Sequence, residues 1–244
     1  MRTKSNSARE ARRPRLLNLF MLLPLVLLAS AAASAQAPAV YDAPERLVVK
    51  SQVLGEERVI LIRTPAGYAR GSEKFPVLYM TDGDAHIQHT SGTVSFLARN
   101  ARMPEMIVVG ITNTDRTRDL TPTRVERAPG NPNAPGFPTS GGADKFLKFI
   151  ETELIPLVES KYRTMPYRAL AGHSLGGLFA VHAMLTKPEL FNSYIAVSPS
   201  LQWDNFEELD RVKEFFKTRK DLNRTLFTSL PASMMPHSSV SEIS

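Results

Sequence analysis

One short stretch constrains the fold of this chain more than any other: Gly172-His173-Ser174-Leu175-Gly176-Gly177. It contains the pattern Gly-x-Ser-x-Gly, in which a serine sits on a sharp turn between a strand and a helix. Its neighbours fit that context, because a short, mostly apolar run precedes it at 167–171 and a longer apolar run follows it at 175–185. The pattern alone is common in proteins. In this context it indicates a nucleophile elbow with Ser174 at its tip.

The geometry of such a turn explains its residues. Ser174 must adopt a strained backbone conformation that exposes its hydroxyl above the edge of the sheet. Glycine is needed at 172 and 176 because a side chain there would collide with the neighbouring strand and helix. The helix that follows adds free N–H groups and a positive dipole end beside the hydroxyl. We therefore predict that Ser174 is a nucleophile in acyl transfer; a structural glycine turn is the alternative.

The rest of the chain alternates between strand-like and helix-like patterns. Strands are expected at 46–50 and 58–62, joined by a short hairpin, and at 75–80, 106–111, 167–171, 193–198 and 224–228. Helices are expected at 92–100, 143–162 (kinked or broken at Pro156), 175–185 and 206–218, and a long irregular loop at 121–142. This alternation predicts an α/β fold: a doubly wound, mostly parallel sheet with an antiparallel edge strand.

The positive charge lies almost entirely at the N-terminus. The formal net charge is +6, of which the first fifteen residues contribute +5, leaving +1 for the rest. A nucleic-acid partner therefore has no electrostatic support. The chain has no cysteine, so it has no disulfide, no thiol nucleophile and no cysteine metal site. Its histidines are scattered without a ligand spacing such as His-Glu-x-x-His, so we predict no metal and no cofactor.

The first 35 residues have the three parts of an export signal. A basic region ends at Arg15, an apolar run follows at 16–33, and Ala33-Ser34-Ala35 offers a cleavage site before Gln36. An uncleaved membrane anchor is the alternative, but the most apolar part of the run is short for a spanning helix, which needs about 20 residues. We predict a signal peptide at 1–35, a linker at 36–44 and a periplasmic or secreted protein that contacts the membrane only through its signal.

Four blocks of sequence together resemble one enzyme family: Val77–Asp84 (VLYMTDGD), Val109–Pro122 (VGITNTDRTRDLTP), the elbow, and Ser198–Asp204 (SPSLQWD). Over 47–230 the chain is similar to the "putative esterase" family of α/β-hydrolases. That family includes siderophore (enterobactin-type) esterases, feruloyl and acetyl-xylan esterases, S-formylglutathione hydrolases and mycolyltransferases. The second block looks most like the periplasmic siderophore-esterase branch. The resemblance implies an α/β-hydrolase domain at 45–230 and a serine esterase acting on a small-molecule ester.

The resemblance also implies an oxyanion hole. In this family the residue after the Asp-Gly pair donates one backbone N–H, which here belongs to Asp84, and the residue after the nucleophile donates the other, which here is Leu175. Loss of one such donor typically lowers the rate by ~10²–10³. An ordinary turn at the end of a strand is the alternative for 82–84.

Two arginines, Arg116 and Arg118, follow the strand expected at 106–111. They lie at the carboxyl end of that strand, where ligands bind in open α/β sheets. We consider them candidates for binding an anionic or catecholate substrate. Ion pairs with Asp115 or Asp119 are the alternative.

A general base for Ser174 is not evident. In α/β-hydrolases the acid and the histidine follow the serine in the sequence. The five histidines of the chain are His86, His89, His173, His182 and His237. The first two precede the serine, the third should point away from its hydroxyl, and the fourth should be packed or on the surface of its helix. His237 comes late enough, but no Asp or Glu lies between 230 and 237 and no strand or helix pattern precedes it.

We therefore interpret the irregular segment 231–244 as a truncated or frameshifted end of a longer hydrolase. Two classes of function stay open: a secreted serine esterase, and a catalytically incomplete fragment or non-catalytic binding module. Peptidase or acyltransferase activity on the same scaffold is a third. Without a base, Ser174 should react slowly or not at all with a fluorophosphonate. A sheet that ends at 224–228 should also present an open edge and uncovered apolar surface.

Overall fold

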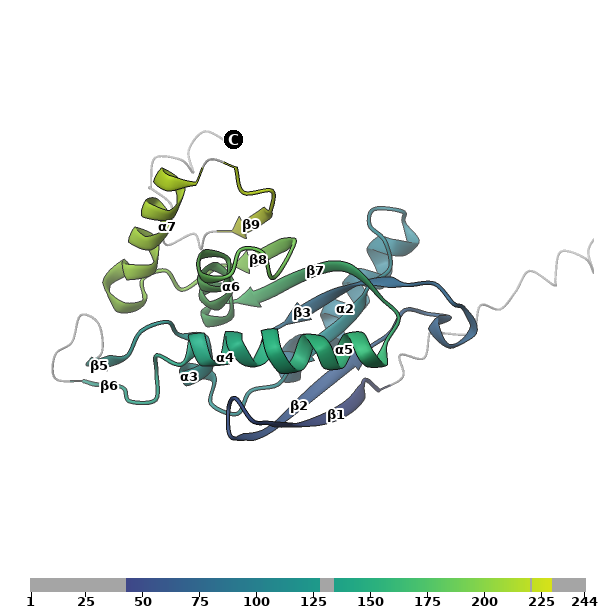
Figure 1. The fold of residues 1–244 in the computed structure, drawn as a ribbon, viewed down its shortest axis with the longest axis horizontal. Coiled ribbons are helices and arrows are strands. Elements are labelled where there is room, and N and C mark those ends of the chain that lie inside the picture. The colour runs from purple at the N-terminus through teal and green to yellow at the C-terminus, as the bar shows by residue number, and fades with distance from the viewer. Residues whose placement is uncertain (1–42, 128–133, 220, 230–244) are drawn as a thin grey trace, which may run out of the picture. The chain divides into compact units, whose positions relative to one another are not determined.

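The computed structural model describes residues 43–127, 134–219 and 221–229 (Figure 1). The predicted signal peptide at 1–35, most of the predicted linker at 36–44, and the segment 231–244 lie outside the described residues. Within the described residues, no helix combines the length and the apolar character needed to cross a membrane.

A seven-stranded sheet forms the centre of the domain, in the order β1-β2-β4-β3-β7-β8-β9. Its strands are β1 (Glu45–Ser51), β2 (Glu56–Arg63), β3 (Phe75–Met80), β4 (Ile107–Ile111), β7 (Thr164–His173), β8 (Ser193–Val197) and β9 (Thr225–Ser229). The pairs β1–β2 and β2–β4 are antiparallel, and the four pairs from β4 to β9 are parallel. The predicted doubly wound, mostly parallel sheet with an antiparallel edge is confirmed.

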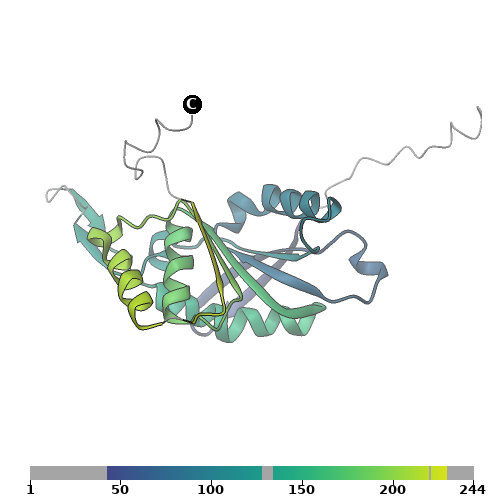
Figure 2. The same cartoon turned by 90° about the horizontal axis from the view of Figure 1, so that it is seen from above.

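Helices cover both faces of this sheet. They are α2 (Gly83–Arg99), α3 (Arg116–Leu120), α4 (Ala143–Phe149), α5 (Ile155–Lys161), α6 (Leu175–Thr186) and α7 (Glu207–Thr218), with 3-10 turns at Tyr68–Arg70 and Trp203–Phe206. Figure 2 shows α2 on one face and α4, α5 and α6 on the other. The central strands are buried on both sides, as their unbroken apolar sequences predict: every residue of β4 is buried.

The two faces are not equally covered. Under α6, Leu170 and Tyr194 are completely buried. On the α2 face, the cover extends over β3 and β4, but Val197 on β8 and Phe227 on β9 stay 38% and 57% exposed. Among the described residues β9 is the last strand of the sheet, as its place in the sequence predicts.

The helix predicted at 92–100 is longer than expected, since α2 begins at Gly83. Its buried residues Ile87, Ser91 and Val94 share one face of the helix, but the polar residues among them hide the helical period. The first residue of the helix must be a glycine, because the backbone of β4 lies against it: a Cβ on Gly83 would be 2.4 Å from the carbonyl carbon of Gly110.

The segment predicted as a loop at 121–142 contains a short antiparallel pair, β5 (Val125–Arg127) with β6 (Pro135–Phe137). Gly136 permits this pairing, because a Cβ there would be 2.2 Å from the carbonyl carbon of Glu126. Residues 128–133 lie outside the described part of the chain.

The helix predicted at 143–162 is interrupted, as Pro156 indicated. Residues Ile150–Leu154 form a π-helical segment between α4 and α5, and Pro156 is the second residue of α5. A proline has no N–H to donate to the preceding turn of the helix, and its ring crowds the carbonyl of the residue four positions earlier. The regular α-helical hydrogen-bond pattern is therefore interrupted at that point.

Candidate active site

Ser174 forms the tip of the turn between β7 and α6. Its backbone has φ 58° and ψ −116°, a conformation that non-glycine residues rarely adopt. Its N–H donates to the carbonyl of Val197 at 3.0 Å. Its carbonyl accepts from Leu178 N at 2.9 Å and from Ser200 N at 3.1 Å. The predicted strained turn between a strand and a helix is confirmed.

The glycines of the motif have close neighbours. A Cβ on Gly172 would lie 2.1 Å from the carbonyl oxygen of Gly176, so the backbone leaves no room for a side chain at 172. A Cβ on Gly176 would lie 2.2 Å from the side-chain Oγ1 of Thr81, which follows β3, so a larger residue at 176 would require Thr81 to move. The turn therefore lies directly against the end of β3.

The hydroxyl of Ser174 lies 3.1 Å from the hydroxyl of Ser200, and either can donate. Ser200 lies in the sequence block 198–204, but nothing in the sequence indicates that this segment turns back onto the elbow, so its place beside Ser174 was not predictable. Among the described residues, no histidine ring nitrogen is hydrogen-bonded to Ser174 Oγ. His237 lies outside them.

The described histidines have other surroundings. His173 is exposed, and its ring centroid lies 6.1 Å from that of His86, which in turn lies 5.0 Å from that of His89. Of the two alternatives for His182, packed or on the surface of its helix, the structure shows the packed one, and its ring nitrogens face Asp144 Oδ1 at 2.8 Å and Glu208 Oε1 at 3.2 Å.

The two predicted oxyanion donors both lie in the first turn of a helix, Asp84 in α2 and Leu175 in α6. The first N–H groups of a helix have no partner within it. In α2 the carbonyl of Asp82 accepts hydrogen bonds from the N–H groups of Ala85 and His86, both at 3.0 Å. Asp84 comes before these two residues, so its N–H lies ahead of the first hydrogen bonds of the helix. The contact between Gly176 and Thr81 brings the two helix starts together. Their role in binding an oxyanion stays a prediction.

Arg116 forms a fork with the carboxylate of Asp82. Its Nε donates to Oδ1 at 2.6 Å and its Nη2 donates to Oδ2 at 3.1 Å, while Asn113 Nδ2 donates to Oδ1 at 2.7 Å. The Asp82 side chain is only 5% exposed. Sequence analysis considered Asp115 and Asp119 as partners and missed Asp82, which lies 34 residues away in the sequence.

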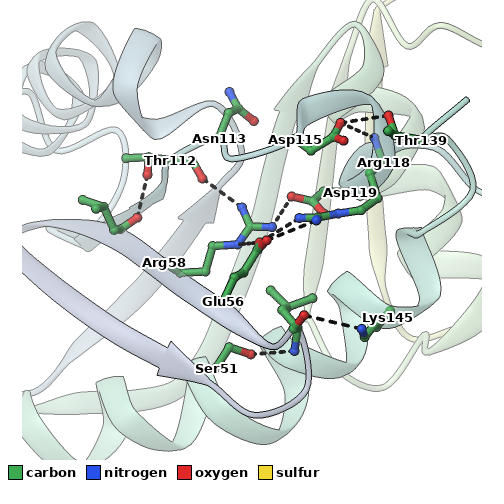
Figure 3. Close-up of polar contacts among 12 residues, drawn as sticks. Ser51, Glu56, Arg58, Thr112, Asn113, Asp115, Arg118, Asp119, Thr139 and Lys145 are labelled. Carbon is green, nitrogen blue, oxygen red and sulfur yellow. Dashed lines mark hydrogen bonds and ion pairs between the residues drawn. The ribbon is translucent and has the colours of Figure 1, made fainter. Parts of the chain in front are cut away.

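The Arg118 side chain points into a cluster of charged side chains (Figure 3). Its Nε donates to Asp119 Oδ1 at 2.8 Å and its Nη2 donates to Glu56 Oε1 at 2.7 Å. Hydrogen bonds to these two carboxylates raise the pKa of the Arg118 guanidinium. The ion pair with Asp119, the alternative that the sequence left open, is present; contact of Arg116 or Arg118 with substrate stays a prediction.

A buried arginine completes this cluster. Arg58 on β2 is 1% exposed and pairs with Asp119, which is 2% exposed. Arg58 Nε also lies 2.9 Å from Glu56 Oε1, and its Nη1 donates to the carbonyl of Thr112 at 3.3 Å. The four side chains of the cluster, Glu56, Arg58, Arg118 and Asp119, therefore join β2 to α3.

Asp115 caps the start of α3. Its Oδ1 accepts from the N–H of Arg118 at 3.0 Å and from Thr139 Oγ1 at 3.2 Å. The backbone hydrogen bond from Arg118 is the main cause that lowers the pKa of this carboxyl group.

A cavity of about 340 Å³ lies beside the elbow on the α2 face of the sheet. Its lining residues are Met80, Thr81, His86, His89, Thr90, Ala171, Gly172, His173 and Val197. Within the part of the chain that the structure describes, no group of three His, Cys, Asp or Glu side chains is arranged to hold a metal ion.

Comparison with known proteins agrees with this architecture. The family model described as "Putative esterase" matches residues 51–226. The ferri-bacillibactin esterase BesA of Bacillus subtilis is 35% identical over 184 residues, which cover 69% of this chain and 60% of the relative. The siderophore enterobactin esterase of Emericella nidulans is 36% identical over 154 residues, 57% of this chain and 50% of the relative.

Among solved structures, an IroE-like serine hydrolase from Shewanella oneidensis superimposes with a TM-score of 0.72 at 38% identity. The match covers 76% of this chain and 60% of that one. The chain thus spans no more than three fifths of the length of these relatives. The likeness extends from the sheet to the elbow and supports the α/β-hydrolase fold that the sequence predicts.

Proposed function

The chain belongs to the "Putative esterase" family, and on that premise we propose that it is a serine hydrolase that cleaves carboxylic esters through an acyl-enzyme. The observation that carries this proposal is the backbone of Ser174, which has φ 58° and ψ −116° at the start of a buried helix. Strain of this kind in a non-glycine residue marks functional sites, because the surrounding structure must maintain it.

The geometry suits the first half of such a reaction. A general base takes the proton of the Ser174 hydroxyl as its oxygen attacks the ester carbonyl, and the carbonyl oxygen becomes an oxyanion that the N–H groups of Asp84 and Leu175 stabilise. Both groups belong to helix N-termini, whose dipoles favour negative charge. The ester C–O bond then breaks and the alcohol leaves with the proton from the base. Water, deprotonated by the same base, attacks the acyl group, and Ser174 regains its proton as the carboxylic acid leaves.

We infer a siderophore-type ester as the substrate class. This inference rests on the relatives, among them the bacillibactin and enterobactin esterases. The proposed reaction calls for no cofactor, because ester hydrolysis through an acyl-enzyme needs only a nucleophile, a proton acceptor and oxyanion donors.

We also propose that the protein is exported. The basic, apolar and small-residue regions of 1–35, in that order, support this proposal. N-terminal sequencing of protein recovered from the periplasm or the medium should give a chain that starts near Gln36. Recovery of the intact chain from the cytosol would contradict export.

Hydrolysis of a p-nitrophenyl acyl ester tests the serine mechanism. We expect Ser174→Ala to abolish this hydrolysis, because no acyl-enzyme can form without the hydroxyl. Removal of a nucleophile typically costs on the order of 10³-fold or more. Activity that survives in Ser174→Ala would contradict the proposal.

A second candidate function is binding without turnover. It is favoured by the contact of Ser174 Oγ, which among the described residues is with the hydroxyl of Ser200 and not with an imidazole. Titration with an intact siderophore, followed by chromatography of the ligand, separates the two. Saturable binding with unchanged ligand favours the binding protein, whereas Ser174-dependent products favour the hydrolase.

A further inference from the structure

We propose that Arg116 is a positioning residue that locks the oxyanion turn against the nucleophile elbow, and that it does not bind the charge of the substrate. The proposal rests on the proposed hydrolase function, in which Asp84 and Leu175 supply the oxyanion donors. It goes further by assigning a role to a charged side chain that touches neither donor.

The first observation is that the charge of Arg116 is already matched. The guanidinium faces both oxygens of Asp82, at 2.6 and 3.1 Å, and forked pairs of this kind are the strongest charge-assisted hydrogen bonds. To form the same fork, a substrate anion would have to displace Asp82, whose side chain is 95% buried. A carboxylate left without its partner in such surroundings is costly, so exchange of Asp82 for a substrate anion is unfavourable.

The second observation is that the pair contacts the elbow from both sides of Ser174. Arg116 Nη2 lies 3.4 Å from the carbonyl oxygen of His173, the residue before the serine. Asp82 Oδ2 lies 3.2 Å from the position that a Cβ of Gly176 would take, two residues after the serine. The pair therefore fixes the spacing between the end of β3 and the elbow.

The third observation concerns Asn113, which comes from the same β4–α3 segment as Arg116. Its amide nitrogen lies 2.7 Å from Asp82 Oδ1 and 3.3 Å from Asp84 Oδ1. The β4–α3 segment thus holds both Asp82, which lies just before the helix, and Asp84, the predicted oxyanion donor. Since Asp82 has a left-handed φ of 55°, the turn depends on these outside contacts to keep its shape.

The segment that presents Arg116 is itself anchored. α3 has only five residues, too few to be stable alone. The cluster of Glu56, Arg58, Arg118 and Asp119 ties α3 to β2 (Figure 3). Ion pairs therefore join β2 to α3, and Arg116, the first residue of α3, joins α3 to the turn that carries Asp84. Together these contacts set the position of a donor that must be correct to a few tenths of an ångström.

Amide hydrogen exchange tests this role without requiring turnover. In Arg116→Gln, we expect exchange to rise at least ~10-fold in both 82–88 and 173–178, since both segments lose a shared restraint. Arg124→Gln is the matched control, because Arg124 is 60% exposed and its pair with Glu126 is 3.6 Å long, so neither segment should change. Unchanged exchange in both segments of Arg116→Gln would overturn the proposal.

Kinetics supply the second readout. With a neutral and an anionic p-nitrophenyl ester, Arg116→Gln should lower kcat on the order of 10–100-fold for both, with KM nearly constant. Arg116→Lys should recover only part of this loss, because an ammonium cannot form the fork. A raised KM confined to the anionic ester would overturn the positioning role. If the unaltered protein shows no Ser174-dependent turnover, the hydrolase proposal fails, and hydrogen exchange alone decides the role of Arg116.

Discussion

The two sides of Ser174 are built in different ways. On one side, the β3–α2 turn and the β4–α3 segment are fixed by charged side chains, with the fork between Arg116 and Asp82 next to the elbow. On the other side, the segment after β8 reaches Ser174 through a hydroxyl contact from Ser200 at 3.1 Å and a backbone bond. We call them the charged side and the hydroxyl side.

The difference separates two tasks of a serine hydrolase. The charged side carries Asp84, one of the two proposed oxyanion donors, and its contacts lie within the described residues. On the hydroxyl side, no described histidine or carboxylate is hydrogen-bonded to Ser174 Oγ.

The substitution with the largest expected effect on the free energy of unfolding lies in the elbow, which both sides share. Gly172→Ala would place a Cβ 2.1 Å from the backbone oxygen of Gly176, where no side chain can move aside. We expect a loss of more than ~4 kcal/mol in the free energy of unfolding, or no folded protein, by urea denaturation. Gly92→Ala in α2 is the control, because nothing lies within 4 Å of its Cβ and it should stabilise by up to ~1 kcal/mol. Equal effects of the two would contradict the account of the elbow.

The next effect belongs to the charged side. Asp119→Ala removes the buried carboxylate partner of Arg58, which is itself almost completely buried, and leaves it only the partly exposed Glu56. Loss of one member of a buried pair typically costs ~3–5 kcal/mol, measurable by the same denaturation. The exposed pair of Lys213 and Asp210 gives the comparison, since Asp210→Ala should cost no more than ~1 kcal/mol. A small effect of Asp119→Ala would show that the cluster does not anchor α3.

A smaller effect is expected on the hydroxyl side. Ser200→Ala removes the hydroxyl contact to Ser174 Oγ but leaves the backbone bond from Ser200 N in place. The free energy of unfolding should fall by ~0.5–1.5 kcal/mol, as for an ordinary hydrogen bond. A change as large as that of Asp119→Ala would remove the distinction between the two sides.

The smallest effect is a dependence on pH at the start of α3. The pKa of Asp115 is lowered in the folded protein, chiefly by the hydrogen bond from Arg118 N. Its stabilising effect is therefore present above the usual aspartate pKa and is lost as the pH falls through that range towards the lowered value. Asp115→Asn keeps the capping oxygen but has no carboxyl group to titrate. Its free energy of unfolding should be lower by ~0.3–1 kcal/mol at neutral pH and should fall less steeply as the solution is acidified. If both proteins lost stability equally on acidification, the charge at this cap would not be stabilising.

Sequence reasoning succeeded where the determining contacts are local. The elbow and the strands on either side of it follow from apolar runs and two glycines within a short stretch, so their positions were predictable. The start of α2 was not predictable from the sequence, because it depends on the packing of Gly83 against Gly110 on β4. The pairing of Arg116 was missed for the same reason, since Asp82 lies 34 residues away and a nearer aspartate was available on each side.

The central claim is that Ser174 is the nucleophile, and mapping the adduct of a fluorophosphonate tests it most directly. The neighbouring Ser200 makes the test strict, because its hydroxyl lies only 3.1 Å away. After prolonged incubation, we expect peptide mass spectrometry to find the phosphonyl group on Ser174, and Ser174→Ala to remain unlabelled. An adduct on Ser200, or labelling that persists in Ser174→Ala, would contradict the assignment.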